Sequence, residues 1–133
     1  RIGDAIVAVL KAGIPVMGHL GLLPQSVHQV GGYGVQATEQ SAGEALAQQA
    51  RELESVGCFG IVLEKVPAAL ARRVSEQLTI PTIGIGAGAG CDGQVLVMHD
   101  MLGLGIKAKH SKVYRDLRAI MGEAFSEYVE EVR

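Results

Sequence analysis

The sequence predicts an α/β protein in which short parallel strands alternate with helices. Four short apolar runs occur along the chain, and turn-forming residues such as glycine and proline flank them. Segments with the spacing of amphipathic helices separate the first three runs and follow the fourth. Short, continuous apolar strands are typical of parallel sheets with both faces covered, and their alternation with helices is typical of βαβ units.

A short helix and a strand are predicted at the beginning of the chain. Ile2, Ile6 and Val9 recur at helical spacing, and Gly13 follows them as a stop signal. The run 14–20 (IPVMGHL) predicts a buried strand.

A loop, a second helix and a second strand come next. Residues 21–35 are rich in turn-forming residues, which predicts the loop. Ser41 and Glu44 have the spacing of a capping box, which predicts the start of a helix. The inner face of this helix is predicted to carry Leu46, Ala50, Leu53 and Gly57. The run 59–66 (FGIVLEKV) predicts the second buried strand.

A third helix, two more strands and a last helix complete the predicted order. Pro67 suits the first turn of the third helix. Its inner face is predicted to carry Leu70, Val74 and Leu78. The runs 82–87 (TIGIGA) and 94–98 (QVLVM) predict the third and fourth strands. The last helix is predicted from an apolar stripe made of Tyr114, Leu117, Met121, Phe125, Tyr128 and Val132.

Length, charge and cysteine content restrict the function classes. The 133 residues fit one domain, and a net charge of −2 gives no attraction to nucleic acid or anionic membranes. No apolar run reaches the roughly 20 residues of a membrane helix, and the first residues lack the layout of an export signal. Cys58 and Cys91 have neither CxxC nor metal-ligand spacing, which favours a reducing compartment. We therefore expect a cytoplasmic protein without nucleic-acid or membrane partners.

Candidate site residues lie where the predicted strands end. In parallel α/β folds, active residues lie at the carboxyl ends of the strands. The first predicted strand ends near His19, and the second ends at Glu64. The third ends in the glycine-rich run from Gly84, and the fourth is followed by His99 and Asp100. These ends converge in such a fold, so we expect the four groups to meet at one edge of the sheet.

Glu64 and His19 each have two interpretations. Glu64 ends an apolar strand, where partial desolvation makes a carboxylate a stronger proton acceptor and suits a general base. The alternative is a carboxylate paired with Lys65. His19 stands between Gly18 and Leu20, where a ligand can approach closely. The alternative is a core histidine bonded to a backbone carbonyl.

The other candidates also have structural alternatives. His99 and Asp100 have side chains that suit a divalent cation, but Asp100 equally suits a helix cap. The run from Gly84 to Gly90 can bind phosphate through backbone N–H groups, although it lacks the complete dinucleotide and P-loop patterns. A sharp turn after the strand is the favoured explanation of these glycines. His28 and His110 are predicted to lie on the surface.

Several blocks of the sequence together resemble the ketopantoate hydroxymethyltransferases (3-methyl-2-oxobutanoate hydroxymethyltransferases). They occur in the family's order and at fitting distances, from about Ile14 to the last helix. The blocks are residues 15–22 (PVMGHLGL), 24–27 (PQSV), 31–33 (GGY), 35–36 (VQ), 61–64 (IVLE), 66–67 (VP), 80–88 (IPTIGIGAG), 91–97 (CDGQVLV) and 99–100 (HD).

The resemblance implies a (β/α)8 TIM barrel of the phosphoenolpyruvate/pyruvate superfamily. Residues 1–133 would carry only the last four strands and their helices, as the carboxyl-terminal half of a single barrel domain. The implied reaction transfers a hydroxymethyl group from 5,10-methylenetetrahydrofolate to 3-methyl-2-oxobutanoate. It gives 2-dehydropantoate, for pantothenate and coenzyme A biosynthesis.

The resemblance also implies roles for two residues and a metal. Glu64 matches the general base that removes the C3 proton, and His19 matches a substrate-binding histidine of the pocket. Mg²⁺ would chelate the 2-oxo acid and stabilise its enolate. The family enzymes usually form large homo-oligomers.

The sequence departs from the family's pattern at several positions. Lys65 stands where Cys is usual, Gly34 where a basic residue is common, and Ala37 and Thr38 where Gly-Arg is typical; residues 105–112 also differ from the usual run. The family's Mg²⁺ ligands and its substrate-binding Ser and Lys lie upstream of Arg1. We therefore expect this chain to contain no metal ligands, to be inactive alone and to need the amino-terminal half.

Two other functions stay open. One is a non-catalytic assembly module, a half-barrel that pairs its exposed strand edges with another copy or with the missing half. The other is a different barrel enzyme that grips phosphate at the run from Gly84 to Gly90.

Overall fold

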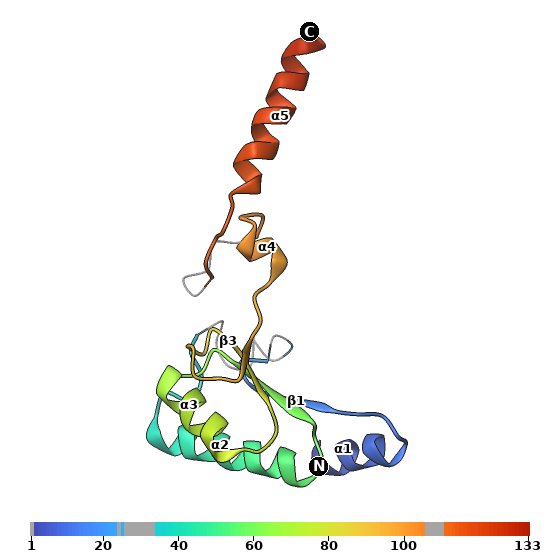
Figure 1. Cartoon of the computed structure of the whole chain (residues 1–133), viewed down its shortest axis with the longest axis vertical. Coiled ribbons are helices and arrows are strands. Elements are labelled where there is room, and N and C mark those ends of the chain that lie inside the picture. The colour runs from blue at the N-terminus through green and yellow to red at the C-terminus, as the bar shows by residue number, and fades with distance from the viewer. Residues whose placement is uncertain (1, 24, 26–33, 106–110) are drawn as a thin grey trace. The chain divides into compact units, whose positions relative to one another are not determined.

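The computed structural model describes residues 2–23, 25, 34–105 and 111–133 (Figure 1). It divides into two compact units, Arg1–Val95 and Leu96–Arg133. The first unit contains α1 (Ile2–Lys11), β1 (Met17–Gly21), α2 (Gln40–Ser55), β2 (Gly60–Glu64), α3 (Ala68–Gln77), β3 (Thr82–Ile85) and β4 (Gly93–Gln94). The second contains α4 (Met98–Met101) and α5 (Leu117–Glu131).

The strands of the first unit form one parallel sheet in the order β1-β2-β3-β4. Sequential strands lie side by side, and α2 and α3 connect the first three of them, which confirms the predicted βαβ arrangement. At the carboxyl ends of the strands, Gly21 pairs with Glu64, and Glu64 pairs with Ile85. The sheet therefore aligns the ends of β1, β2 and β3.

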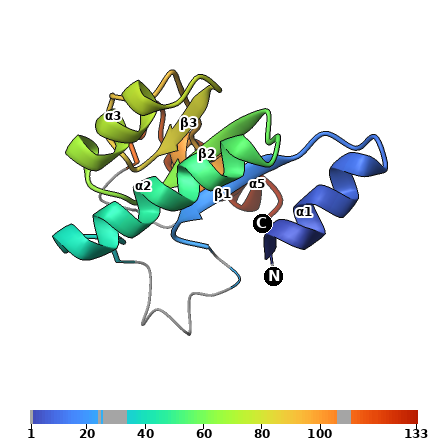
Figure 2. The same cartoon turned by 90° about the horizontal axis from the view of Figure 1, so that it is seen from below.

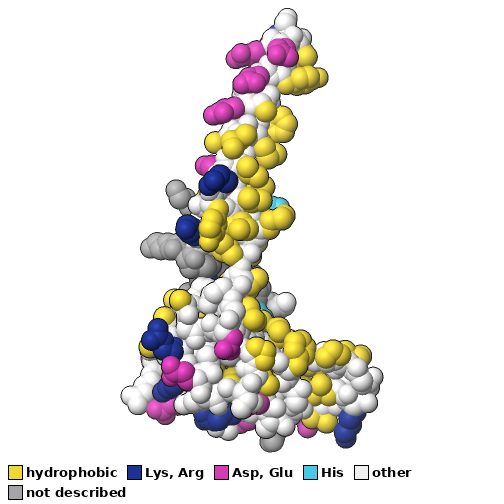
Figure 3. Space-filling model, viewed as in Figure 1, with side chains coloured by type: hydrophobic (Ala, Val, Ile, Leu, Met, Phe, Trp, Pro, Cys, Tyr) yellow, Lys and Arg dark blue, Asp and Glu magenta, His cyan; other side chains and the backbone are white. Residues whose placement is uncertain are grey.

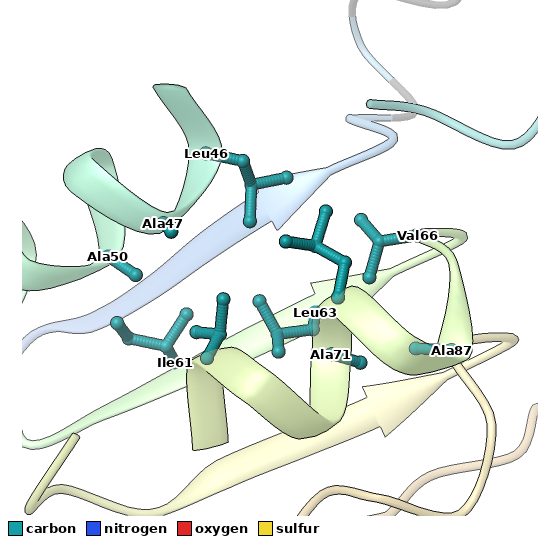
Figure 4. Packing of buried hydrophobic residues seen from close by; sticks show 10 residues of the cluster. Leu46, Ala47, Ala50, Ile61, Leu63, Val66, Ala71 and Ala87 are labelled. Atoms are coloured by element: carbon teal, nitrogen blue, oxygen red, sulfur yellow. The ribbon is translucent and has the colours of Figure 1, made fainter. Parts of the chain in front are cut away.

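Helices α2 and α3 cover one face of this sheet (Figure 2). Ile61 and Leu63 of β2 point into the layer between sheet and helices and are completely buried. Figure 4 shows the side chains that enclose them, and the cluster consists of Leu46, Ala47, Ala50, Ile61, Leu63, Val66, Leu70, Ala71, Val74 and Ala87. Burying one such aliphatic side chain contributes about 1.5–3 kcal/mol. The predicted inner positions Leu46, Ala50, Leu70 and Val74 are thus confirmed.

Alternate residues of the same strands point to the opposite face. Successive side chains of a strand alternate between the two faces of a sheet. Gly18 faces α2, because a Cβ built there would lie 2.8 Å from Cδ1 of Leu53. His19 therefore faces the other way, as do Val62 and Glu64, and these side chains are only half-buried.

The predicted starts of two helices need correction. Helix α2 begins at Gln40 with Glu39 as its N-cap, so Ser41 lies inside the first turn and forms no capping box. The backbone carbonyl of Glu39 accepts a hydrogen bond from the Gly43 N–H (2.9 Å). The first helical turn therefore begins at Glu39, and Ser41 lies within this turn. Pro67 is the N-cap of α3, one residue before the predicted position.

The predicted fourth strand is wrong over most of its length. Strand β4 contains only Gly93 and Gln94, and the last sheet-like bond runs from the Val95 N–H to the Gly84 carbonyl (3.0 Å). Val97 is already the N-cap of α4, and its carbonyl accepts bonds from Asp100 and Met101. Val95 is 47% exposed and Val97 is 48% exposed, so this apolar run is not a buried strand within the described residues.

Helix α5 begins with a capped turn and presents an exposed apolar stripe. The Asp116 carboxylate accepts a hydrogen bond from the Ala119 N–H (3.2 Å), and Tyr114 lies before the helix rather than on it. Figure 3 shows hydrophobic side chains along one side of α5 and acidic ones along another. Phe125 and Tyr128 are each 63% exposed, so this part of the predicted stripe is not buried within the second unit. Among the described residues, we found no helix with the length and apolar content needed to cross a membrane.

Candidate active site

His19 and Glu64 meet at the carboxyl ends of β1 and β2. His19 pairs with Val62, so Glu64 lies two residues further along the neighbouring strand and on the same face of the sheet. The Nε2 atom of His19 lies 3.1 Å from Oε2 of Glu64. The His19 side chain is 35% exposed and that of Glu64 is 17% exposed. The structure therefore brings together the two residues that the sequence singled out first.

The contact leaves the imidazole nitrogen without a well-aligned partner. The Nε2 atom of His19 is shielded from solvent and, among the described residues, makes no hydrogen bond of good geometry. Buried nitrogen atoms of this kind usually have a hydrogen-bond partner. A substrate oxygen next to Glu64 would supply one, which fits a binding site better than a structural histidine bonded to a backbone carbonyl.

Backbone hydrogen bonds hold the end of β2 from three directions. The Glu64 carbonyl accepts a bond from the Leu22 N–H (2.9 Å), and the Lys65 N–H donates to the Ile85 carbonyl (2.9 Å). The Lys65 carbonyl accepts a bond from the Gln36 N–H (2.7 Å). The close approach of β1 requires a glycine, because a Cβ at Gly21 would lie 2.1 Å from the Glu64 carbonyl oxygen.

Two residues close to the end of β2 have left-handed backbone conformations. Lys65 has φ 48° and Ala37 has φ 54°, and no other non-glycine residue in the described chain has positive φ. This region is uncommon for residues with a Cβ. A glycine at position 37 would adopt this conformation without steric cost.

The glycines after β3 pack against α3. Gly86 and Gly88 have positive φ angles of 61° and 77°. A Cβ at Gly88 would lie 2.4 Å from Cβ of Ala68, and one at Gly90 would lie 2.7 Å from Cβ of Arg72. Turn geometry and close packing thus account for these glycines without a bound phosphate.

An open hollow of about 380 Å³ lies between α3 and the segment after this turn. Its lining consists of Arg72, Ser75, Glu76, Ala89, Gly90, Cys91 and Asp92. One oxygen of Asp92 accepts hydrogen bonds from the backbone N–H (2.8 Å) and the hydroxyl (2.9 Å) of Thr82. These bonds lower the pKa of Asp92 and tie the segment to the buried Thr82. Asp92 is therefore a structural residue, a role that its sequence neighbourhood did not reveal.

His99 and Asp100 do not follow a strand as predicted. Both lie on α4 in the second unit, and Asp100 is not the N-cap of that helix. The Asp100 carboxylate instead accepts a hydrogen bond from the Ser111 hydroxyl (3.3 Å). Among the described residues, no group of three or more His, Cys, Asp and Glu side chains has a geometry that could hold a metal ion. His28, His110 and the blocks 26–27 and 31–33 lie outside the described residues, as does Pro24.

The sequence model of the family described as ketopantoate hydroxymethyltransferase matches residues 1–133. The chain belongs to this family. The resemblance recognised from its sequence blocks is therefore confirmed, and the parallel α/β sheet is consistent with the family's barrel.

Curated members of the ketopantoate hydroxymethyltransferase family match almost the whole chain. A 3-methyl-2-oxobutanoate hydroxymethyltransferase from Bacteroides fragilis is 53% identical over 132 residues, which cover 98% of this chain and 48% of the relative. The enzyme of that name from Porphyromonas gingivalis is 51% identical, and the match covers 100% of this chain and 50% of the relative. One from Caldicellulosiruptor saccharolyticus is 53% identical, and the match covers 98% of this chain and 50% of the relative. The chain thus spans about half the length of these relatives.

Proposed function

We propose that this chain is the carboxyl-terminal half of a 3-methyl-2-oxobutanoate hydroxymethyltransferase. In the complete enzyme, these residues join the family's amino-terminal half, and β1–β4 become the last four strands of a (β/α)8 barrel. The names of the relatives, the half-length match and the parallel sheet support this proposal. The complete enzyme transfers a hydroxymethyl group from 5,10-methylenetetrahydrofolate to 3-methyl-2-oxobutanoate and gives 2-dehydropantoate.

The single observation that carries the proposal is the His19–Glu64 pair at adjacent strand ends. Glu64 acts as the general base: an oxygen of its carboxylate takes the C3 proton of the 2-oxo acid, and the C–H electron pair remains as the enolate. That carbon then forms a bond to the methylene carbon of 5,10-methylenetetrahydrofolate, and the two C–N bonds of the methylene group break. Water supplies the hydroxyl oxygen, tetrahydrofolate leaves, and its nitrogen atoms take up the C3 proton and the second proton of the water. His19 binds the substrate through Nε2, which lies 3.1 Å from Oε2 of Glu64 and makes no hydrogen bond of good geometry among the described residues.

The family's Mg²⁺ does not fit the described part of the chain. No set of three candidate ligands occurs there, and Glu64 contacts a histidine rather than a second carboxylate. We propose that the residues binding Mg²⁺ belong to the amino-terminal half, together with other substrate contacts. The complete enzyme is also proposed to be cytoplasmic and to form a homo-oligomer.

The half-buried face of the sheet favours a second candidate, a non-catalytic assembly module. His19, Val62 and Glu64 lie on a face that no described helix of the first unit covers. A module of this kind would use the face and its strand edges for pairing only. The dependence of turnover on Glu64 separates the two candidates, because a pairing module would not need this carboxylate. We also expect no product from the purified 133-residue chain and turnover from the complete enzyme. Turnover by the chain alone would disprove its dependence on the other half.

The substitution Glu64→Gln in the complete enzyme tests the role of the base. Proton NMR in D₂O follows the exchange of the C3 proton of 3-methyl-2-oxobutanoate. We expect exchange to fall by about 10²–10⁴-fold, the usual contribution of a positioned general base. Glu76→Gln removes an exposed carboxylate of α3 and is the matched control. Unchanged exchange in Glu64→Gln would remove Glu64 from the role of base.

A further inference from the structure

The peptide that follows Glu64 lies in a strained turn. Lys65 has φ 48°, a conformation that its Cβ disfavours and that an unrestrained residue would leave. Such strained backbone persists only where surrounding contacts hold it, and it occurs often at functional sites. The direction of the chain at Lys65 also fixes where β2 ends, and with it the Glu64 side chain.

Two hydrogen bonds hold this turn from opposite sides. The Lys65 N–H donates to the Ile85 carbonyl at the end of β3, a bond that continues the sheet (2.9 Å). The Lys65 carbonyl lies beyond the left-handed residue and accepts its bond from the Gln36 N–H (2.7 Å). The first bond would form for an ordinary strand as well, whereas the second requires the turned conformation.

We propose that Gln36 is a positioning residue for Glu64. Its backbone N–H holds the left-handed turn at Lys65, and the turn keeps the Glu64 carboxylate beside His19. The Gln36 side chain has no part in this, because its amide turns back to the Gly34 carbonyl (3.0 Å). The inference rests on the proposed function of Glu64 as the base, and it assigns a task to the segment between Gly34 and Ala37.

The first test compares Gln36→Pro with Gln36→Ala in the complete enzyme. Proline removes the N–H, whereas alanine removes only the side chain. We expect C3 proton exchange and kcat to fall about tenfold in Gln36→Pro with KM within about twofold, because a misplaced base costs rate more than binding. Gln36→Ala should match the parent. Equal rates in the two variants, or a loss confined to KM, would overturn the proposal.

The second test changes the conformational free energy of the left-handed turn through the residue at position 65. Glycine adopts positive φ readily, alanine at a cost, and a β-branched residue only rarely. Among the single variants, the exchange rate should therefore fall in the order Lys65→Gly, Lys65→Ala, Lys65→Val. In double variants with Gln36→Pro, Lys65→Gly should restore part of the lost rate, whereas Lys65→Ala should not. An exchange rate independent of the residue at position 65 would refute the proposal, even if Gln36→Pro fails to fold. Absence of exchange in the unsubstituted complete enzyme would instead refute the proposed function.

Discussion

The two faces of the parallel sheet differ in what they bury. Ile61 and Leu63 of β2 point toward α2 and α3 and are completely buried, whereas Val62 and Glu64 of the same strand point away from these helices and stay half-buried. One strand thus supplies the core with its odd-numbered residues and the candidate site with its even-numbered ones. Stability and chemistry are therefore separated by the alternation of side chains along one strand rather than by distance along the chain.

The largest effect on folding is expected from Leu63→Ala in the complete enzyme. It deletes a fully buried side chain and leaves a cavity between β2 and the helices, which costs about 2–5 kcal/mol of the free energy of unfolding. Val62→Ala on the opposite face is the comparison and should cost less, because Val62 is only half-buried in the described chain and loses two carbon atoms rather than three. Urea denaturation measures both. Equal losses would show that the two faces do not differ in this way.

Gly21→Ala is expected to reduce both the stability of the fold and the activity of the site. A Cβ at this position would collide with the Glu64 carbonyl, and the φ of 92° is unfavourable for alanine. We expect a loss of about 1–3 kcal/mol in stability, measured by thermal unfolding, together with slower proton exchange. Gly34→Ala is the control, since a Cβ there meets no atom of the described residues within 4 Å. A stable and fully active Gly21→Ala enzyme would contradict the close approach of β1 to Glu64.

Acid should weaken the helix-covered side through Glu54 and Asp92. Hydrogen bonds from the Thr79 backbone and hydroxyl lower the pKa of Glu54 below its usual value, and bonds from Thr82 lower the pKa of Asp92 in the same way. A carboxyl group with a lowered pKa stabilises the fold above its usual pKa, and this contribution disappears as the pH falls through the lowered value. The free energy of unfolding, measured as the pH falls from above the usual pKa of a glutamate to below the lowered one, should therefore decrease less in Glu54→Gln than in the parent. A variant with the parent's pH profile would contradict this role of Glu54.

The smallest effect is expected from Ala37→Gly. Glycine relieves the left-handed conformation at φ 54° but loses more entropy on folding, so the net gain should be about 0.5 kcal/mol. Thr38→Gly is the control, because Thr38 does not have positive φ and should lose stability. A destabilised Ala37→Gly variant would mean that the packing of the Ala37 methyl group outweighs its backbone strain.

Much of the fold follows from periodicity in the sequence. The spacing of Leu46 with Ala50, and of Leu70 with Val74, marks helix faces that the structure buries against the sheet. Periodicity was misleading at residues 94–98, because an apolar run has the same appearance in a buried strand and in an exposed connection. The cap of α2 was also missed, since Ser41 has the right type but lies two residues inside the cap position.

The candidate site was only partly predictable. Glu64 and His19 stand out as polar residues at the ends of apolar runs, and parallel pairing is enough to bring neighbouring strand ends together. The part played by Gln36 and Lys65 could not be predicted, because it depends on a φ angle and a backbone hydrogen bond rather than on the chemistry of a side chain.

The parallel pairing of β1 with β2 also has a kinetic consequence. Parallel neighbours need a long connection, and here the whole of α2 lies between the two strands. Contacts between distant parts of a chain form slowly, because the loop must close before they contribute any stability. The His19–Glu64 pair therefore forms only when the connection that contains α2 has closed, and we expect proton-exchange activity of the complete enzyme to return late in refolding.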